Sequence, residues 1–124
     1  MDIINVSSST AYSLTVNDNN KQIYINCEAN NVTVNLPPLK PGLSFNIIIN
    51  NTAVGNDFTL NAKNSSFVTS QLIYSGQLGT TAFSTLTLDT SGVIYPSEML
   101  FLRCNGSNWY LSFISKDNSN YSTS

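Results

Sequence analysis

The sequence has 124 residues, of which 10% are charged and 41% apolar, and Asn, Ser and Thr together occupy 48 positions (18, 18 and 12). Because these three residue types compete with a helical backbone for its hydrogen bonds, the composition excludes long helices, while the apolar content excludes a disordered chain. A net charge of −2, five scattered Lys and Arg residues and no apolar run of membrane-spanning length exclude nucleic-acid binding and membrane insertion.

The first half of the chain alternates apolar and polar residues with a period of two. This pattern covers residues 12–16, 23–27 and 32–36 and predicts β-strands that are each buried on one face. The turn at 30–31 predicts that the second and third of these strands form a hairpin. The proline-rich stretch 37–42 cannot sit inside a sheet, because proline has no backbone N–H to donate. We expect it to form a rigid corner that carries the chain from one sheet to the next.

The second half continues the same alternation up to a polar tail. Further strands are predicted at 43–49, 58–62, 86–88, 98–104 and 109–114, with a weak signal between 64 and 81. The last two are joined by Asn105-Gly106, a dipeptide typical of hairpin turns. The sequence therefore predicts one domain (1–115) followed by a flexible tail (116–124). The fold class is an all-β, jelly-roll-like antiparallel sandwich of about eight short strands with no substantial helix.

The alternation also predicts which side chains form the core. The expected core residues share the inward-facing positions of their strands: Phe45, Ile47, Leu100, Leu102, Trp109, Leu111 and Phe113. Trp109 could stack on a sugar. However, it faces the same side of its strand as Leu111 and Phe113, which favours a role as a core anchor.

Several strands are apolar on the opposite face as well. The outward positions concerned are Ile48, Met99, Phe101, Tyr110 and Ile114. A strand that is apolar on both faces must be covered on both faces. Two coverings are compatible with the sequence: the segment 64–81 of the same chain, or a second copy of the chain.

The side chains needed for catalysis or metal binding are missing or badly spaced. There is no histidine, no phosphate loop and no Asp-x-Asp calcium motif, so we expect no enzyme activity, no metal and no cofactor. Cys27 and Cys104 have no metal-ligand spacing and are interpreted as buried thiols or as a disulfide between core strands. The N-terminal residues 1–8 lack the basic and apolar regions of a signal peptide.

Two stretches resemble a known group of proteins. Val32-Thr33-Val34-Asn35-Leu36-Pro37, followed by Pro41-Gly42-Leu43-Ser44-Phe45-Asn46-Ile47, is similar to the opening of small β-sandwich domains in viral fibre heads, tail fibres and capsid-associated proteins. Such domains occur in phages and large DNA viruses. The closing stretch from Glu98 to Tyr110 resembles them too, so the resemblance covers about residues 22–114.

The resemblance implies a non-enzymatic structural protein at the virion surface, made in the host cytoplasm. It implies a homotrimer that acts as a fibre head or capsid decoration, with other capsid or fibre proteins as partners and attachment to a host glycan or receptor as a further role. Ile48, Met99, Phe101, Tyr110 and Ile114 are then the expected oligomer interface. The alternative function is a carbohydrate-binding module of a cell-surface or phage spike protein, which an exposed aromatic row across one sheet would favour.

Overall fold

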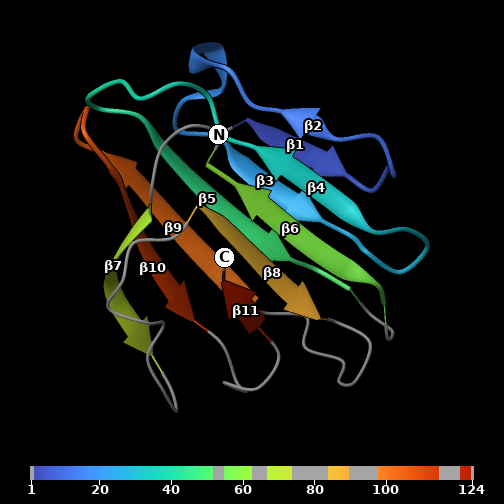
Figure 1. Cartoon of the computed structure of the whole chain (residues 1–124). Helices are drawn as coiled ribbons and strands as arrows, with labels where there is room; N and C mark the ends of the chain where they lie inside the picture. The colour runs from blue at the N-terminus through green and yellow to red at the C-terminus, as the bar shows by residue number, and fades with distance from the viewer. Residues whose placement is uncertain are drawn as a thin grey trace.

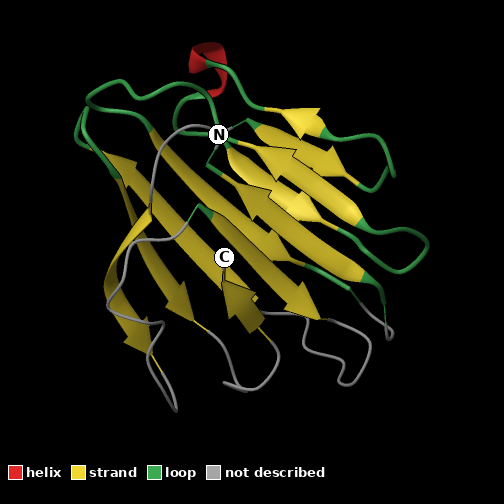
Figure 2. Ribbon diagram, viewed as in Figure 1, coloured by secondary structure: helices red, strands yellow, loops and turns green. Residues whose placement is uncertain are grey.

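The computed structural model describes residues 2–51, 55–62, 67–73, 84–89, 98–114 and 121–123, which form two β-sheets packed on a common core (Figures 1 and 2). The six-stranded sheet has the order β1 (Ile3–Val6), β3 (Gln22–Ile25), β5 (Ser44–Ile49), β9 (Glu98–Cys104), β10 (Trp109–Ile114) and β7 (Phe67–Ile73). The five-stranded sheet has the order β11 (Tyr121–Thr123), β8 (Thr85–Asp89), β6 (Asp57–Asn61), β4 (Val32–Asn35) and β2 (Tyr12–Ser13). Among the described residues the only helical element is the 3₁₀ turn η1 (Val16–Asp18), so the predicted all-β sandwich is confirmed.

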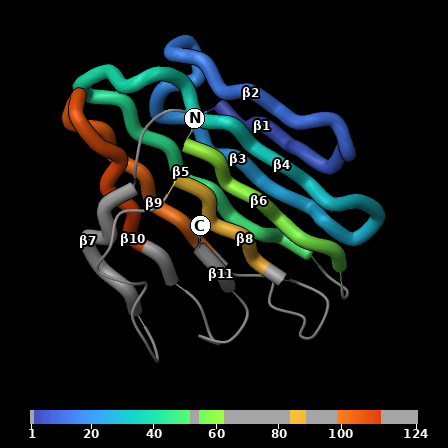
Figure 3. The backbone as a smooth tube through the Cα atoms, viewed as in Figure 1, coloured from blue at the N-terminus to red at the C-terminus, as the bar shows by residue number. Residues whose placement is uncertain are grey.

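The chain alternates between the two sheets from β1 to β8. The colours of Figure 3 show this alternation for β1 to β6. Up to β6, each return to a sheet adds a strand in the same direction, so β1, β3 and β5 are parallel neighbours, as are β2, β4 and β6. Of the nine described strand pairings, five are parallel and four antiparallel. The expectation of purely antiparallel sheets is wrong, because most connections cross to the opposite sheet instead of doubling back.

The predicted hairpin between 23–27 and 32–36 is also wrong. β3 lies in the six-stranded sheet and β4 in the five-stranded sheet, and the inward side chains of both strands are fully buried in the core between them. Hairpin partners and facing strands show the same period-two pattern, so alternation could not distinguish the two arrangements. The hairpin predicted between 98–104 and 109–114 is present as the antiparallel pair β9–β10.

The proline-rich corner carries the chain from β4 in one sheet to β5 in the other, as expected. It packs against the β9–β10 turn: the Gly42 N–H donates to the Cys104 carbonyl at 3.0 Å, and the Cys104 N–H donates to the Leu43 carbonyl at 2.9 Å. Gly106 in that turn has a φ of +94°, and its Cα lies so close to the Pro41 ring that an added Cβ would sit 2.8 Å from Pro41 Cγ. The corner and the turn therefore form one packed unit.

The core contains the side chains that the alternation placed there. The fully buried members of that set are Phe45, Ile47, Leu100, Leu102, Trp109 and Leu111. The side chain of Phe113 lies outside the described residues. The Trp109 ring packs on Phe45, with the ring centroids 5.9 Å apart. Because Trp109 is fully buried, it is a core side chain and has no surface to offer a sugar.

Both cysteines are buried and unbonded, so the disulfide alternative is wrong. Cys27 follows β3, where Ile25 pairs with Ile49 at one end of β5. Cys104 ends β9, where Arg103 pairs with Ser44 at the other end of β5. The thiols are thus separated along the length of that strand, which is too far for a disulfide.

Two segments with weak sequence signals form strands. Residues 67–73 within the 64–81 segment form β7, which pairs with β10 at the edge of the six-stranded sheet. Residues 121–123, expected to belong to a flexible tail, form β11, which pairs with β8.

Candidate functional site

The outward face of the six-stranded sheet carries two adjoining features, an apolar patch and a polar cleft. In the described part of the chain there is no group of three or more His, Cys, Asp or Glu residues that could hold a metal ion. No helix within the same residues is long and apolar enough to cross a membrane. The surface features of this sheet are therefore the structural basis for a functional hypothesis.

The outer apolar patch consists of Ile48, Met99, Phe101 and Tyr110, all half-buried. It lies on the three central strands, where Ile48 of β5 pairs directly with Met99 of β9. Phe101 lies two residues further along β9. It pairs with Ser112 on β10, so Tyr110, two residues before Ser112, is its diagonal neighbour. Cross-strand and diagonal neighbours on one face of a sheet lie within reach of each other, so the four side chains form a continuous surface.

The fifth residue predicted for this surface, Ile114, pairs with Met99 on the far side of β9 from Ile48. The row of paired positions therefore runs from Tyr24 through Ile48 and Met99 to Ile114. The side chain of Ile114 lies outside the described residues, so only its backbone position supports its place in the row.

The structure bears on what covers this patch. The sequence left open whether the segment 64–81 covers it, and the described part of that segment, β7, extends the sheet beside β10 instead of lying over its face. The side-chain oxygen Oδ1 of Asn46, whose residue pairs with Phe101, is buried and has no hydrogen-bond partner. A buried amide oxygen at an outward position shows that water is excluded from this part of the face.

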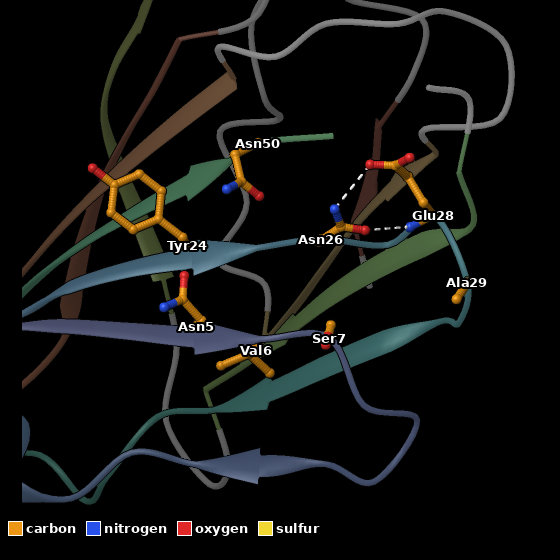
Figure 4. Close-up of a pocket in the computed structure, with 8 residues that line it drawn as sticks. All are labelled: Asn5, Val6, Ser7, Tyr24, Asn26, Glu28, Ala29 and Asn50. Carbon is orange, nitrogen blue, oxygen red and sulfur yellow. Dashed lines mark hydrogen bonds between the residues drawn. The ribbon is translucent and has the colours of Figure 1, made fainter. Parts of the chain in front are cut away.

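The second feature, which we call the amide cleft, is a depression of about 440 Å³ at one corner of the same sheet (Figure 4). Its lining residues come from β1 and β3, from the segments that follow these strands, and from the residue directly after β5: Asn5, Val6, Ser7, Tyr24, Asn26, Glu28, Ala29 and Asn50. Because β1, β3 and β5 are parallel and in register, they end at the same edge of the sheet, and Asn5 is paired with Tyr24 and Tyr24 with Ile48.

The cleft has an ordered polar centre. The Asn26 side chain donates from Nδ2 to Glu28 Oε2 at 2.8 Å, and its Oδ1 accepts the Glu28 backbone N–H at 2.9 Å. The half-buried ring of Tyr24 flanks this pair, and its hydroxyl donates to Gln22 Oε1 at 3.2 Å, outside the set of lining residues. The ring itself, and not the hydroxyl, is what Tyr24 contributes to the cleft.

Sequence reasoning missed the cleft. Asn5, Asn26 and Asn50 occupy polar positions like most of the other 15 asparagines of the chain, and nothing in their spacing distinguishes them. Only the parallel pairing of β1, β3 and β5, which the expected antiparallel fold would not produce, brings them together.

Comparison of the chain with protein-family models, with curated proteins and with solved structures found no match.

Proposed function

We propose that the protein is a non-enzymatic structural domain of a viral surface, a fibre head or capsid decoration, that assembles as a homotrimer through the outer apolar patch. The observation that carries this proposal is the position of Ile48, Met99 and Phe101 on neighbouring central strands, facing away from the core. In this proposal the protein acts at the virion surface, with other capsid or fibre proteins as neighbours.

Covering the outer apolar patch with a second chain is energetically favourable. Each large aliphatic or aromatic side chain gains about 1.5–3 kcal/mol when it is fully removed from water. The half-buried side chains of the patch have realised only part of this gain, and a contiguous apolar surface is unusual on a monomer. A second copy of the chain can supply the remaining contact, and a net charge of −2 per copy opposes association only weakly.

A ring of three copies accommodates such a contact without uncontrolled growth. Head-to-tail contacts between identical chains close into a ring if the rotation between neighbours is suitable, and otherwise grow into a filament. The number three comes from the resemblance to viral fibre-head and capsid-associated domains, which assemble around three-fold axes.

The fold supports that resemblance in one respect. The two resembling stretches, the β4–β5 corner and the β9–β10 hairpin, contact each other through the Gly42–Cys104 and Cys104–Leu43 hydrogen bonds. They form one structural unit, so the shared pattern corresponds to a coherent piece of the molecule.

The mass of the protein in solution tests the proposal. Light scattering after size exclusion, on samples diluted from about 100 µM to about 1 µM, separates a weak contact from a stable one. We expect a species of about three times the chain mass of 13.5 kDa. A single species near 13.5 kDa at every concentration would overturn the proposed trimer.

The second candidate function is a carbohydrate-binding module. Trp109 cannot serve it, because its side chain is fully buried. The observation that favours it is the presence of Tyr24, Phe101 and Tyr110 on the same outward face, where aromatic rings could contact a sugar. Sugar binding by a strictly monomeric protein would favour this function over the structural one.

A further inference from the structure

The amide cleft has the composition of a ligand site that is distinct from the self-association surface. We propose that it binds a neutral oligosaccharide, with the ring of Tyr24 as the apolar wall and the amides of Asn5, Asn26 and Asn50 as the hydrogen-bonding groups. The cleft shares the outer face with the apolar patch, but none of the four patch residues lines it. The inference rests on the second candidate function, for which it names the site and the class of sugar, and it does not depend on self-association.

Asn26 is held in a fixed orientation by Glu28. One Nδ2 hydrogen and one Oδ1 lone pair of Asn26 are engaged by the carboxylate and backbone N–H of Glu28. A primary amide has two donor hydrogens and two acceptor lone pairs, so Asn26 retains one of each. A fixed donor beside a fixed acceptor matches a pair of adjacent sugar hydroxyls, and the prior ordering lowers the entropic cost of binding.

Asn5 and Asn50 lie on either side of Tyr24, as Figure 4 shows. Both are exposed, and neither side-chain amide makes a hydrogen bond within the described part of the chain. Each therefore has a complete set of donors and acceptors for a ligand. A hydroxyl-rich molecule in the cleft would meet amides from three neighbouring strands at once.

Tyr24 supplies the apolar part of the site. Because its hydroxyl is engaged by Gln22, the ring is held in place beside the amides. The C–H groups on one face of a hexose can pack against an aromatic ring, while its hydroxyls point to the surrounding amides. The combination of one ring with several amides is suited to a sugar better than to an apolar ligand.

Charge decides against an acidic ligand. Among the described residues that line the cleft, Glu28 is the only charged one, and none of them is Lys or Arg. A phosphate, sulfate or sialic-acid carboxylate would find no cation to pair with among these described residues. A single carboxylate is also too few for a calcium site, which needs six to eight oxygen ligands. A neutral sugar is the class that remains.

The test is an NMR titration of the full-length, ¹⁵N-labelled protein with neutral hexose and N-acetylhexosamine oligosaccharides, each compared with a sialylated counterpart. We expect at least one neutral oligosaccharide to shift the amide signals of Asn5, Tyr24 and Asn26, with a dissociation constant of roughly 1 mM or lower. The absence of any shift up to about 10 mM, shifts confined to other parts of the sheet, or preference for the sialylated form would overturn the proposal.

Matched variants localise the binding. Asn50→Ala should weaken it about tenfold, the effect of one or two lost hydrogen bonds. Asn17→Ala is the control, because Asn17 is equally exposed and lies on η1, at the opposite end of β3 from the cleft. Equal affinity of Asn50→Ala and Asn17→Ala would overturn the assignment of the site.

A second pair of variants tests the aromatic wall. Tyr24→Phe should retain binding, because the ring remains, whereas Tyr24→Ala should abolish it. Loss of binding in both variants would contradict a stacking role. The mass of the same samples tests the trimer independently of the cleft. A monomer that binds sugar at the cleft would support the sugar site and contradict the trimer. A trimer that binds no sugar would support the trimer and contradict the sugar site.

Discussion

Trp109 is the largest fully buried side chain, and its indole nitrogen Nε1 is buried without a hydrogen-bond partner. Its contribution to stability therefore comes from packing in the core, which includes the contact with the Phe45 ring. We expect Trp109→Ala to lower the free energy of unfolding by about 3–5 kcal/mol. Trp109→Phe should cost much less, because it keeps a ring and loses no hydrogen bond. Urea denaturation measures both, and equal losses in the two variants would contradict this account.

Cys27 is a buried thiol whose environment disfavours ionisation. Burial, with a smaller contribution from the nearby charge of Asp57, raises the pKa of Cys27 from 9.0 to about 11. An acid whose pKa is raised by folding stabilises the folded state fully below the unfolded pKa, and this contribution is lost as the pH rises toward the folded pKa. The unfolded chain ionises first and is thereby favoured at high pH.

We therefore expect the free energy of unfolding to fall between pH 9 and pH 11, and part of this fall to disappear in Cys27→Ala. Urea denaturation across that range gives the slope for each protein. Cys104→Ala is the control, since it removes the other buried thiol and leaves Cys27 in place. If Cys27→Ala shows the same slope as the unmodified protein, the thiol is not responsible.

At the scale of elements, the β9–β10 turn of the six-stranded sheet packs against the proline-rich corner that links the two sheets. Gly106 is required there for two reasons: its φ of +94° is unfavourable for other residues, and a Cβ would sit 2.8 Å from Pro41 Cγ. Gly42, in the corner itself, has a similar φ of +89° but open space around it. An alanine at position 42 would therefore meet backbone strain alone, whereas an alanine at position 106 would meet both backbone strain and steric overlap.

We expect Gly42→Ala to cost about 1 kcal/mol, the strain of a left-handed backbone alone. Gly106→Ala should cost about 2–3 kcal/mol, because the turn must also move away from Pro41. Thermal or urea denaturation measures the difference. A Gly106→Ala variant that is as stable as Gly42→Ala would show that the turn can move away from Pro41 at no cost in stability.

At the scale of the whole molecule, the outer apolar patch predicts how the assembly responds to a buried charge. If the proposed trimer forms through this patch, Phe101→Asp should convert it to a monomer, because an unpaired carboxylate in an apolar contact is strongly unfavourable. Thr33→Asp introduces the same charge on the half-buried outward face of β4 in the other sheet and should leave the mass unchanged. Light scattering gives the mass, and circular dichroism shows whether each variant keeps its β-structure. A folded Phe101→Asp variant that remains trimeric would show that the patch is not part of the interface.

The sequence by itself determined the secondary-structure class and most of the core. Period-two alternation reports which side of a strand is buried, so Phe45, Leu100 and Trp109 could be assigned to the interior without knowing which strands pair. The hairpin between β9 and β10 could be predicted as well, because the preference of Asn-Gly for a hairpin turn depends only on these adjacent residues.

Only the tertiary structure decided which sheet each strand joins, and with it the position of the amide cleft. A short connection such as the one from β3 to β4 can double back in one sheet or cross to the other, and both outcomes bury the same side chains. The choice depends on packing between residues far apart in the chain, which no local pattern encodes. Asn5, Tyr24 and Asn50 meet for that reason alone: crossing connections make β1, β3 and β5 parallel, and parallel strands end at the same edge.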